Sequence, residues 1–420
     1  MLYSPGLYIG AILACYAPTL SSAIPLHRVR DTRTYIVKLK SGIVPGSHLS
    51  DSSFAQFNER LYDPRVLNGY AIGLTPSAME VLKAKYAEQI EYVEEDQVVY
   101  STSEIVQNDA TWGLQRISQK VWFYACSRAS VAITSVATSL RRAPYLKVAA
   151  RPRLITHTTM IPLVEKPELG VDIYIFDTGV YVEHEEFGGR ATHAPVFIDN
   201  STPGDRYGHG THCAGTAAGA RYGVAKKANI IDVKVLSDNG SGSVSAIIAG
   251  LSWAVANAKN TNRPGVISMS LGSFGSSTGA QADAVRQTVA SGLAVVVAAG
   301  NEASSATEWT PANVDEAIVV GNLDIFDGQY RTSNYGPTLD VFAPGTNVVS
   351  AGITGPSAIK VDTGTSMAAP HVAGIVAYLL SLEGPRTPAE LSARIVELAI
   401  PGVLSGLSSN TTNLVAQLPA

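Results

Sequence analysis

Short apolar segments alternate with helix-forming segments from residue 170 onward, and this alternation constrains the fold more than any other feature. Buried strands are expected at residues 171–176, 228–236, 265–270, 293–299 and 317–320, with helices at 244–258 and 280–291. This order predicts an α/β fold in which a mostly parallel sheet carries helices on both faces. Active sites of such sheets lie at the carboxyl ends of the strands. Asp177 and Asn301 both follow strand ends.

Length and charge limit the remaining function classes. The chain has 420 residues, which suffices for a large core and more than one domain. Its formal net charge of −4 gives no bulk attraction to nucleic acid, so we expect no nucleic-acid partner. The three cysteines are too few for a disulfide framework.

The first residues predict a secreted protein. An apolar stretch at Leu7–Leu20 ends in Ser21–Ala23, which is typical of a signal peptide over residues 1–23. One feature disagrees, because no Lys or Arg precedes Arg28. The stretch is short for a membrane span, and we expect no membrane association. In a secreted protein the sequons at Asn200, Asn239 and Asn410 are candidate N-glycosylation sites.

Residues 24–106 read as a separate small unit. Strands are expected at 35–40, 66–74, 90–93 and 97–100, and helices at 51–61 and after Thr75-Pro76. Thr75 is the expected N-cap of the second helix, with proline at its first position. The order predicts a compact α+β domain of ferredoxin-like type. An independent regulatory or binding domain remains the alternative.

Residues 107–169 form an atypical basic insertion in this pattern. No Asp or Glu occurs between residue 119 and Glu165, and no helical or strand period is sustained. The alternatives are a basic linker or a processing site at Arg141-Arg142. We interpret residues 119–164 as a translated intron or an error in the gene model.

One serine and three polar residues elsewhere in the chain together suggest a catalytic site. Ser366 lies where Gly364-Thr365 leads into an apolar helix, and the N–H groups at a helix start favour a developing negative charge. Such a serine is either a helix cap or a nucleophile with a base. Asp177 and His209 supply an acid that orients a base, in the chain order Asp, His, Ser. The side chain of Asn301 can donate to an oxyanion, with the Ser366 N–H as second donor.

These motifs resemble the subtilisin family of serine proteases. The matching segments are Asp177-Thr178-Gly179, His209–Thr216, Ala299-Gly300-Asn301 and Gly364–His371. Cys213, which follows the second histidine of its motif, makes the chain most similar to the fungal, proteinase-K-like branch. The resemblance implies a subtilisin-like catalytic domain over residues 170–420. It also implies a monomeric secreted endopeptidase that acts through a Ser-His-Asp triad and an acyl-enzyme.

The resemblance assigns roles to the earlier unit and to individual residues. Residues 24–106 would be an inhibitory propeptide, removed by self-cleavage between Tyr100 and Trp112, and residues 107–169 would be the start of the mature chain with its atypical basic insertion. Asp177 would orient the base His209, and Ser366 would be the nucleophile. The substrate strands would be formed by Gly240, Ser241, Gly242, Ser270, Leu271 and Gly272. The primary pocket would be lined by Ala298, Ala299 and Gly300, and the calcium ligand would be Asp340. Small pocket walls imply broad specificity favouring large apolar or aromatic residues. Calcium would be structural, with no catalytic cofactor.

Four alternatives need a test. Asp177 and Asp362 both begin Asp-Thr-Gly motifs, so an aspartic protease dyad is one of them. His209 and His212 are spaced for a zinc site, but no glutamate lies between them. A disulfide could join Cys126 to Cys213. A pseudoprotease would bind peptides without hydrolysis. If His209 is the base, activity is expected at neutral to alkaline pH.

Overall fold

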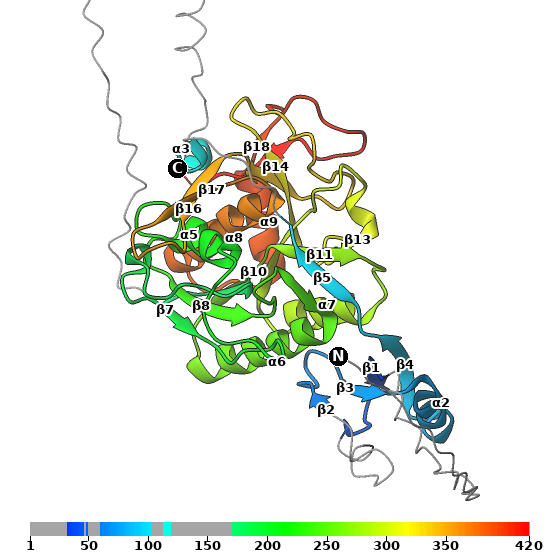
Figure 1. Ribbon diagram of the computed structural model, residues 1–420. Helices are drawn as coiled ribbons and strands as arrows, with labels where there is room; N and C mark the ends of the chain where they lie inside the picture. Colours follow the sequence, from blue (N-terminus) through cyan, green and yellow to red (C-terminus); the bar gives the residue numbers. More distant parts are fainter. Residues whose placement is uncertain (1–31, 46–47, 49–58, 103–111, 119–169, 420) are drawn as a thin grey trace, which may run out of the picture.

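The computed structural model describes residues 32–45, 48, 59–102, 112–118 and 170–419. The predicted signal peptide, Arg141-Arg142, Cys126 and most of the basic insertion lie outside these ranges. Figure 1 shows a large α/β body and a small separate unit formed by the first strands.

A nine-stranded sheet forms the centre of the large body, in the order β18-β19-β15-β14-β12-β10-β6-β8-β7. All of its neighbouring pairs are parallel except β18 with β19. Its strands are β6 (Asp172–Asp177), β7 (Ala191–His193), β8 (Asn229–Lys234), β10 (Gly265–Met269), β12 (Ala294–Ala298), β14 (Ile318–Leu323), β15 (Val341–Pro344), β18 (Ile400–Pro401) and β19 (Leu414–Val415). The predicted parallel sheet is thus confirmed.

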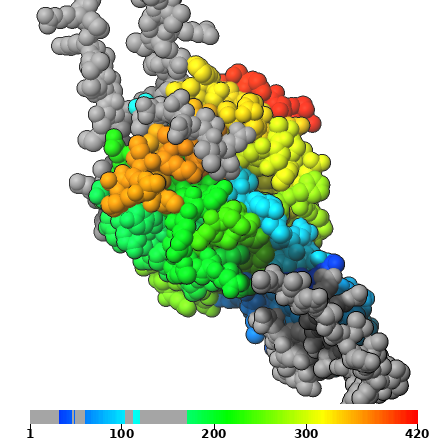
Figure 2. All heavy atoms as spheres, viewed as in Figure 1, coloured from blue at the N-terminus to red at the C-terminus, as the bar shows by residue number. Residues whose placement is uncertain are grey.

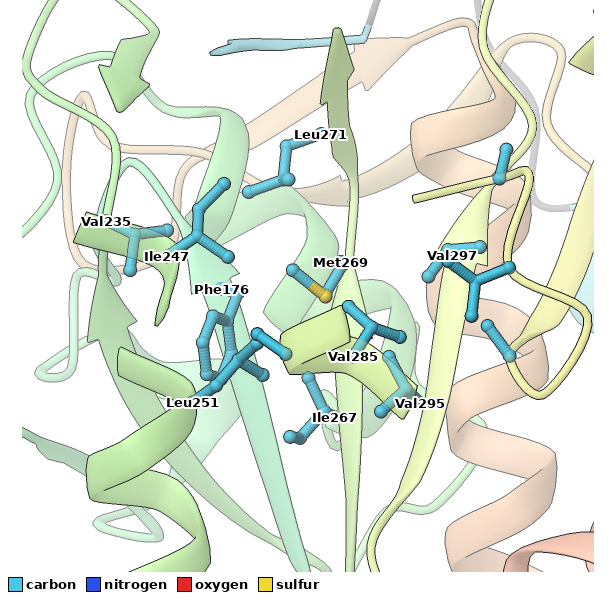
Figure 3. Close-up of a cluster of buried hydrophobic side chains, with 14 of the residues drawn as sticks. Phe176, Val235, Ile247, Leu251, Ile267, Met269, Leu271, Val285, Val295 and Val297 are labelled. Carbon is cyan, nitrogen blue, oxygen red and sulfur yellow. The ribbon is translucent and has the colours of Figure 1, made fainter. Parts of the chain in front are cut away.

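Helices cover both faces of this sheet. They are α5 (His209–Ala218), α6 (Val244–Thr261), α7 (Ala280–Ala290), α8 (Thr365–Glu383) and α9 (Pro388–Leu398), with the short turns η1 (Glu185–Phe187) and η2 (Ala306–Glu308). Successive strand residues point to opposite faces. Phe176 and Ile267 therefore pack against α6 and α7, as Figure 3 shows, whereas Ile175 and Val266 pack with α5 and α8.

The helix α8 is long and apolar enough to span a membrane, and it is the one such helix within the described ranges. It lies in the core, because 83% of its apolar window is buried. Its apolarity is therefore explained by packing against the sheet and α5.

Four antiparallel strands and one helix form the small unit, in the sheet order β2-β3-β1-β4. The elements are β1 (Arg33–Leu39), β2 (Glu59–Leu61), β3 (Gly69–Leu74), α2 (Pro76–Lys85) and β4 (Ile90–Glu95). Thr75 caps α2 as predicted, since its Oγ1 accepts a hydrogen bond from the Ala78 N–H at 3.3 Å. The predicted helix at 51–61 is wrong at its end, where residues 59–61 pair with β3 as strand β2; residues 51–58 lie outside the described ranges.

The predicted strand at 97–100 exists as β5 (Val98–Ser101) but does not belong to the small sheet. It inserts between β9 (Ser241–Ser243) and β11 (Leu271–Phe274) of the large body, in a sheet of order β13-β11-β5-β9 that ends with β13 (Trp309–Thr310). A hairpin of β16 (Val348–Ala351) and β17 (Ile359–Asp362) completes the strands. The short helix α3 (Trp112–Ser118) packs beside β15.

Candidate active site

Asp177 is the last residue of β6, at the carboxyl edge of the sheet. Its Oδ1 accepts a hydrogen bond from the Thr178 N–H at 2.7 Å and lies 2.7 Å from His209 Nδ1. The aspartate and the imidazole are both buried, at 1% and 0% exposed. The structure therefore brings together the first two residues of the expected constellation, with the carboxylate fixing one orientation of the ring.

His209 begins α5, and the residue that holds this helix against β6 is Asp205. Its Oδ1 accepts from the Thr178 hydroxyl at 2.9 Å, and its Oδ2 accepts from the Thr211 N–H at 2.9 Å. The helix approaches so closely that a Cβ on Gly210 would lie 2.2 Å from the Gly179 carbonyl oxygen. Sequence reasoning missed Asp205, although its position four residues before the helical histidine was a usable signal.

Burial is the largest single influence on the pKa of His209 and lowers it, but the Asp177 carboxylate and the Cys213 side chain together raise the pKa well above its usual value. The other ring nitrogen, Nε2, is buried and has no hydrogen-bond partner in the described structure. A ring that is held by a carboxylate at Nδ1 and is free at Nε2 can accept a proton there.

A buried lysine, also missed by sequence reasoning, supports the same loop. Lys234 ends β8, and its ammonium group donates to the Thr178 carbonyl oxygen and lies 2.8 Å from Asp238 Oδ1. The side chain is 1% exposed. It therefore links the loop after Asp177 to the loop that leads into β9.

Ser366 is the second residue of α8, and its hydroxyl contacts Thr102, the residue after β5. Ser366 Oγ lies 2.7 Å from Thr102 Oγ1 and is hydrogen-bonded to the Thr102 carbonyl oxygen. The Ser270 hydroxyl donates to the Ser366 carbonyl oxygen at 2.8 Å and so fixes the start of the helix. A peptide carbonyl group therefore occupies the position in front of this serine.

Asn301 reaches the same carbonyl oxygen from the other side. Its Nδ2 donates to Thr102 O at 2.7 Å, and its Oδ1 accepts from the Thr365 N–H at 3.0 Å. The amide is thus oriented by the chain segment that carries Ser366. The Thr102 carbonyl oxygen lies between a hydroxyl and an amide donor, which is the arrangement that stabilises negative charge on such an oxygen.

The segments predicted to hold a substrate do hold an extended strand. Val99 pairs with Gly242 and Tyr100 with Ser241, while Tyr100 also pairs with Gly272 on the opposite edge. Figure 2 shows this cyan segment lodged between green and yellow parts of the body. Val99 is fully buried in the cluster that includes Leu236 and Leu271. Of the residues predicted for the primary pocket, Ala298 is the last residue of β12. Ala299 and Gly300 lie between β12 and Asn301.

Asp340 lies away from this constellation, beside β14. Its Oδ2 accepts from the Val319 N–H at 2.8 Å. Burial, with a smaller contribution from the nearby Asp315 carboxylate, raises the pKa of Asp340 to about 6. A half-buried carboxylate oxygen of this kind is a ligand that a hard cation such as calcium prefers.

Within the described ranges, the structure forms neither the aspartate dyad nor the zinc site. Asp362 lies in β17 with Lys360 at 2.7 Å, whereas Asp177 contacts His209, so the described carboxylates make no dyad. His212 binds the Val348 carbonyl oxygen, and burial lowers its pKa to about 4. Cys213 is a buried free thiol, and its predicted disulfide partner lies outside the described residues. Ligand atoms of Asp177, His209 and Cys213 lie within 4.8 Å of one another, but two of them already bond each other.

Comparison with known proteins decides the family. The pattern of the subtilase family matches residues 169–416. The chain belongs to the subtilase family. Subtilisin-like protease 1 of Pseudogymnoascus destructans is 35% identical over 97% of this chain and 96% of its own length. Proteinase R of Parengyodontium album is 38% identical over 91% of this chain and 88% of its own length.

A solved structure agrees with these sequence matches. The crystal structure of a cold adapted subtilisin-like serine proteinase aligns with a TM-score of 0.59 at 34% identity, and it covers 74% of this chain and all of its own. The protein is therefore a subtilisin-like serine protease, similar to fungal proteinase-K-like enzymes.

Proposed function

We propose that this protease is a secreted endopeptidase made as a precursor, which cleaves its own chain between Thr102 and Ser103 and then hydrolyses other proteins. The observation that carries the proposal is the Thr102 carbonyl group, which lies against Ser366 Oγ and accepts a hydrogen bond from Asn301 at 2.7 Å. The secreted location is supported by the apolar stretch at Leu7–Leu20. Asn200 and Asn410 remain the preferred glycosylation acceptors, because the Asn239 side chain already binds Ser241.

In this mechanism Ser366 Oγ adds to the Thr102 carbonyl carbon while His209 Nε2 takes the hydroxyl proton. Asp177 holds the ring and stabilises its charged form. The oxyanion receives hydrogen bonds from Asn301 and from the Ser366 N–H. When the intermediate collapses, the peptide C–N bond breaks and His209 gives its proton to the departing nitrogen of Ser103. Water, deprotonated by His209, then hydrolyses the acyl-enzyme.

The unit before Thr102 acts as the inhibitory propeptide in this proposal. Its β5 fills the cleft between β9 and β11, and its last residue covers Ser366. Because strand pairing uses the backbone, the emptied cleft can accept extended segments of many proteins. The small residues Ala298, Ala299 and Gly300 favour large apolar or aromatic side chains before the cleaved bond. The processed enzyme would act as a monomer.

The test is labelling of the purified, processed chain with a fluorophosphonate, together with sequencing of its new N-terminus. We expect a labelled enzyme that begins at Ser103. The Ser366→Ala variant should remain an unlabelled full-length precursor, because hydrolysis without the nucleophile falls by about 10⁶-fold, a magnitude measured in subtilisin itself. A folded chain that binds peptides but is neither labelled nor cleaved would instead be a pseudoprotease.

We also propose that Asp340 is a structural calcium ligand, supported by its burial beside Asp315. Calcium would compensate the buried carboxylate without entering the reaction. Chelation with EGTA should lower the melting temperature of the processed enzyme, and Asp340→Asn should remove most of that calcium dependence. An unchanged melting temperature on chelation would contradict the assignment.

A further inference from the structure

Two acidic side chains upstream of β5 bind the N-termini of two helices in the large body. Asp96 Oδ1 accepts from the Ser245 N–H at 2.9 Å, and its Oδ2 accepts from the Ser245 hydroxyl at 2.5 Å, in the first turn of α6. Glu94 Oε2 accepts from the Ala280 N–H at 2.8 Å, where α7 begins. Both helix ends carry unsatisfied N–H groups and partial positive charge, which favour carboxylates.

These two sites continue the path of the strand that fills the cleft. Counting Thr102 as the first residue before the proposed cleavage, Asp96 is the seventh and Glu94 the ninth. Backbone contacts are unbroken between them, because Val98 pairs with Ser243 and the Gln97 carbonyl oxygen accepts from the Val244 N–H at 3.0 Å. Any extended chain that follows β5 in the cleft therefore arrives at Ser245.

A cavity next to these helix ends contains an unmet hydrogen-bond donor. It has a volume of about 380 Å³ and is lined by Glu94 and Gln97 on one side and by Gly279 and Gln281 on the other. Gln281 is only 3% exposed, and its Nε2 has no hydrogen-bond partner in the described structure. The acidic side chain of the first turn of α7, Asp283, contacts Lys38 and Tyr92 of the small unit. After the small unit leaves, Arg286, which lies 3.3 Å from Asp283, remains to balance its charge.

We propose that, in the processed enzyme, the N-termini of α6 and α7 with Ser245 and Gln281 form an extended substrate site. This site selects proteins that carry acidic side chains seven and nine residues before the cleaved bond. The inference rests on the proposed protease function and extends its substrate class, because the groups that hold Asp96 and Glu94 remain on the large body after the propeptide leaves.

Burial raises the pKa of Asp96, whereas the hydrogen bonds from Ser245 lower it. The net pKa is raised, so the two bonds offset only part of the cost of removing the carboxylate from water, and loss of either bond should weaken the contact. Glu95 provides a matched comparison, because its carboxylate binds Arg33 within the small unit.

The experiment uses processed enzyme and internally quenched peptides that copy residues 92–106. We expect the Asp96→Ala peptide to lose about fivefold or more in kcat/KM, mostly through KM, and the Glu94→Ala peptide to lose somewhat less. The Glu95→Ala peptide should match the parent within about twofold, and Asp96→Asn should fall between parent and alanine.

A second arm tests whether Ser245 is the receptor. The Ser245→Ala enzyme loses the hydroxyl that donates to Asp96 but keeps the backbone N–H, so the advantage in kcat/KM of the parent peptide over the Asp96→Ala peptide should shrink. The inference is overturned if Asp96→Ala and Glu95→Ala peptides behave alike with the unmodified enzyme, or if Ser245→Ala leaves the preference intact. A short chromogenic peptide that ends in Val-Tyr-Ser-Thr reports hydrolysis alone. Its failure would refute the protease proposal, whereas its cleavage without acidic preference would refute only the extended site.

Discussion

The segments on either side of the proposed cleavage are held by the same body in opposite ways. β5 is held by its backbone, which pairs with β9 and β11, while Val98 and Tyr100 remain 54% and 58% exposed. Helix α3 is held by its side chains: Trp112, Arg116 and Ile117 are at most 5% exposed. Only residues 102–111 separate β5 from α3 in the sequence. In Figure 1, α3 lies near the C-terminus, whereas β5 lies beside β11.

Under the proposed cleavage, this difference would make the contact of β5 replaceable and that of α3 permanent. Backbone pairing tolerates many sequences, so β5 can be exchanged for a substrate. The contacts of α3 are specific, since the Trp112 indole donates to the Thr346 carbonyl oxygen and the Arg116 guanidinium donates to Asp327. A cut at Thr102–Ser103 would leave the side-chain contacts of α3 in the mature enzyme and would release the backbone pairing of β5.

Arg116→Ala should cause the largest loss of stability among the variants compared here. The guanidinium is 1% exposed and contacts Asp327 twice, at 2.6 and 3.2 Å. Removing one partner of such a buried pair leaves an uncompensated charge and typically costs about 3–5 kcal/mol. Urea unfolding of the processed enzyme measures this loss. The exposed Lys259→Ala is the control and should change the free energy of unfolding by less than about 0.5 kcal/mol. Equal effects would show that α3 is not a specific anchor.

Val99→Ala should have a smaller effect, and only before processing. Val99 is fully buried, whereas its neighbour Val98 is 54% exposed. In the uncleaved Ser366→Ala precursor, Val99→Ala should lower the free energy of unfolding by about 2 kcal/mol through lost apolar burial. Val98→Ala should leave it nearly unchanged. If Val99→Ala and Val98→Ala change the free energy of unfolding equally, then backbone pairing alone holds β5 and the burial of Val99 contributes nothing to stability.

The sequence predicted those features that depend on local pattern. Strand ends placed Asp177 at the edge of a parallel sheet, and the structure confirms β6, β8, β10, β12 and β14 near their expected bounds. The small residue Gly210 lets α5 approach the loop after Asp177, because a Cβ there would lie 2.2 Å from the Gly179 carbonyl oxygen. Thr75 likewise predicted its helix start, because an N-cap is a local hydrogen bond.

Features that depend on distant contacts were missed. Residues 59–61 form a strand because β3 offers them an edge, not because their own sequence demands it. The sequence of β5 is typical of any half-exposed strand. Only the tertiary structure shows that its partners, β9 and β11, lie about 140 and 170 residues later in the chain. Asp205 and Lys234 act through hydrogen bonds to Thr178, which a composition or period does not reveal.

The pH dependence of self-processing tests the site while β5 is still in place. It reports the proton state of His209 in the uncleaved precursor. The protonated imidazole cannot accept the Ser366 proton. Burial lowers the pKa of His209, but Asp177 and Cys213 together raise it well above its usual value. The processing rate should therefore rise with pH through a midpoint above about 6.5, the ordinary histidine value. Timed gel analysis of the precursor at a series of pH values measures that midpoint. The slow Asp177→Asn precursor should show a lower midpoint, because the raising charge is gone. A midpoint at or below about 6.5 in the unmodified chain would mean that burial dominates and that the carboxylate orients the ring without charging it.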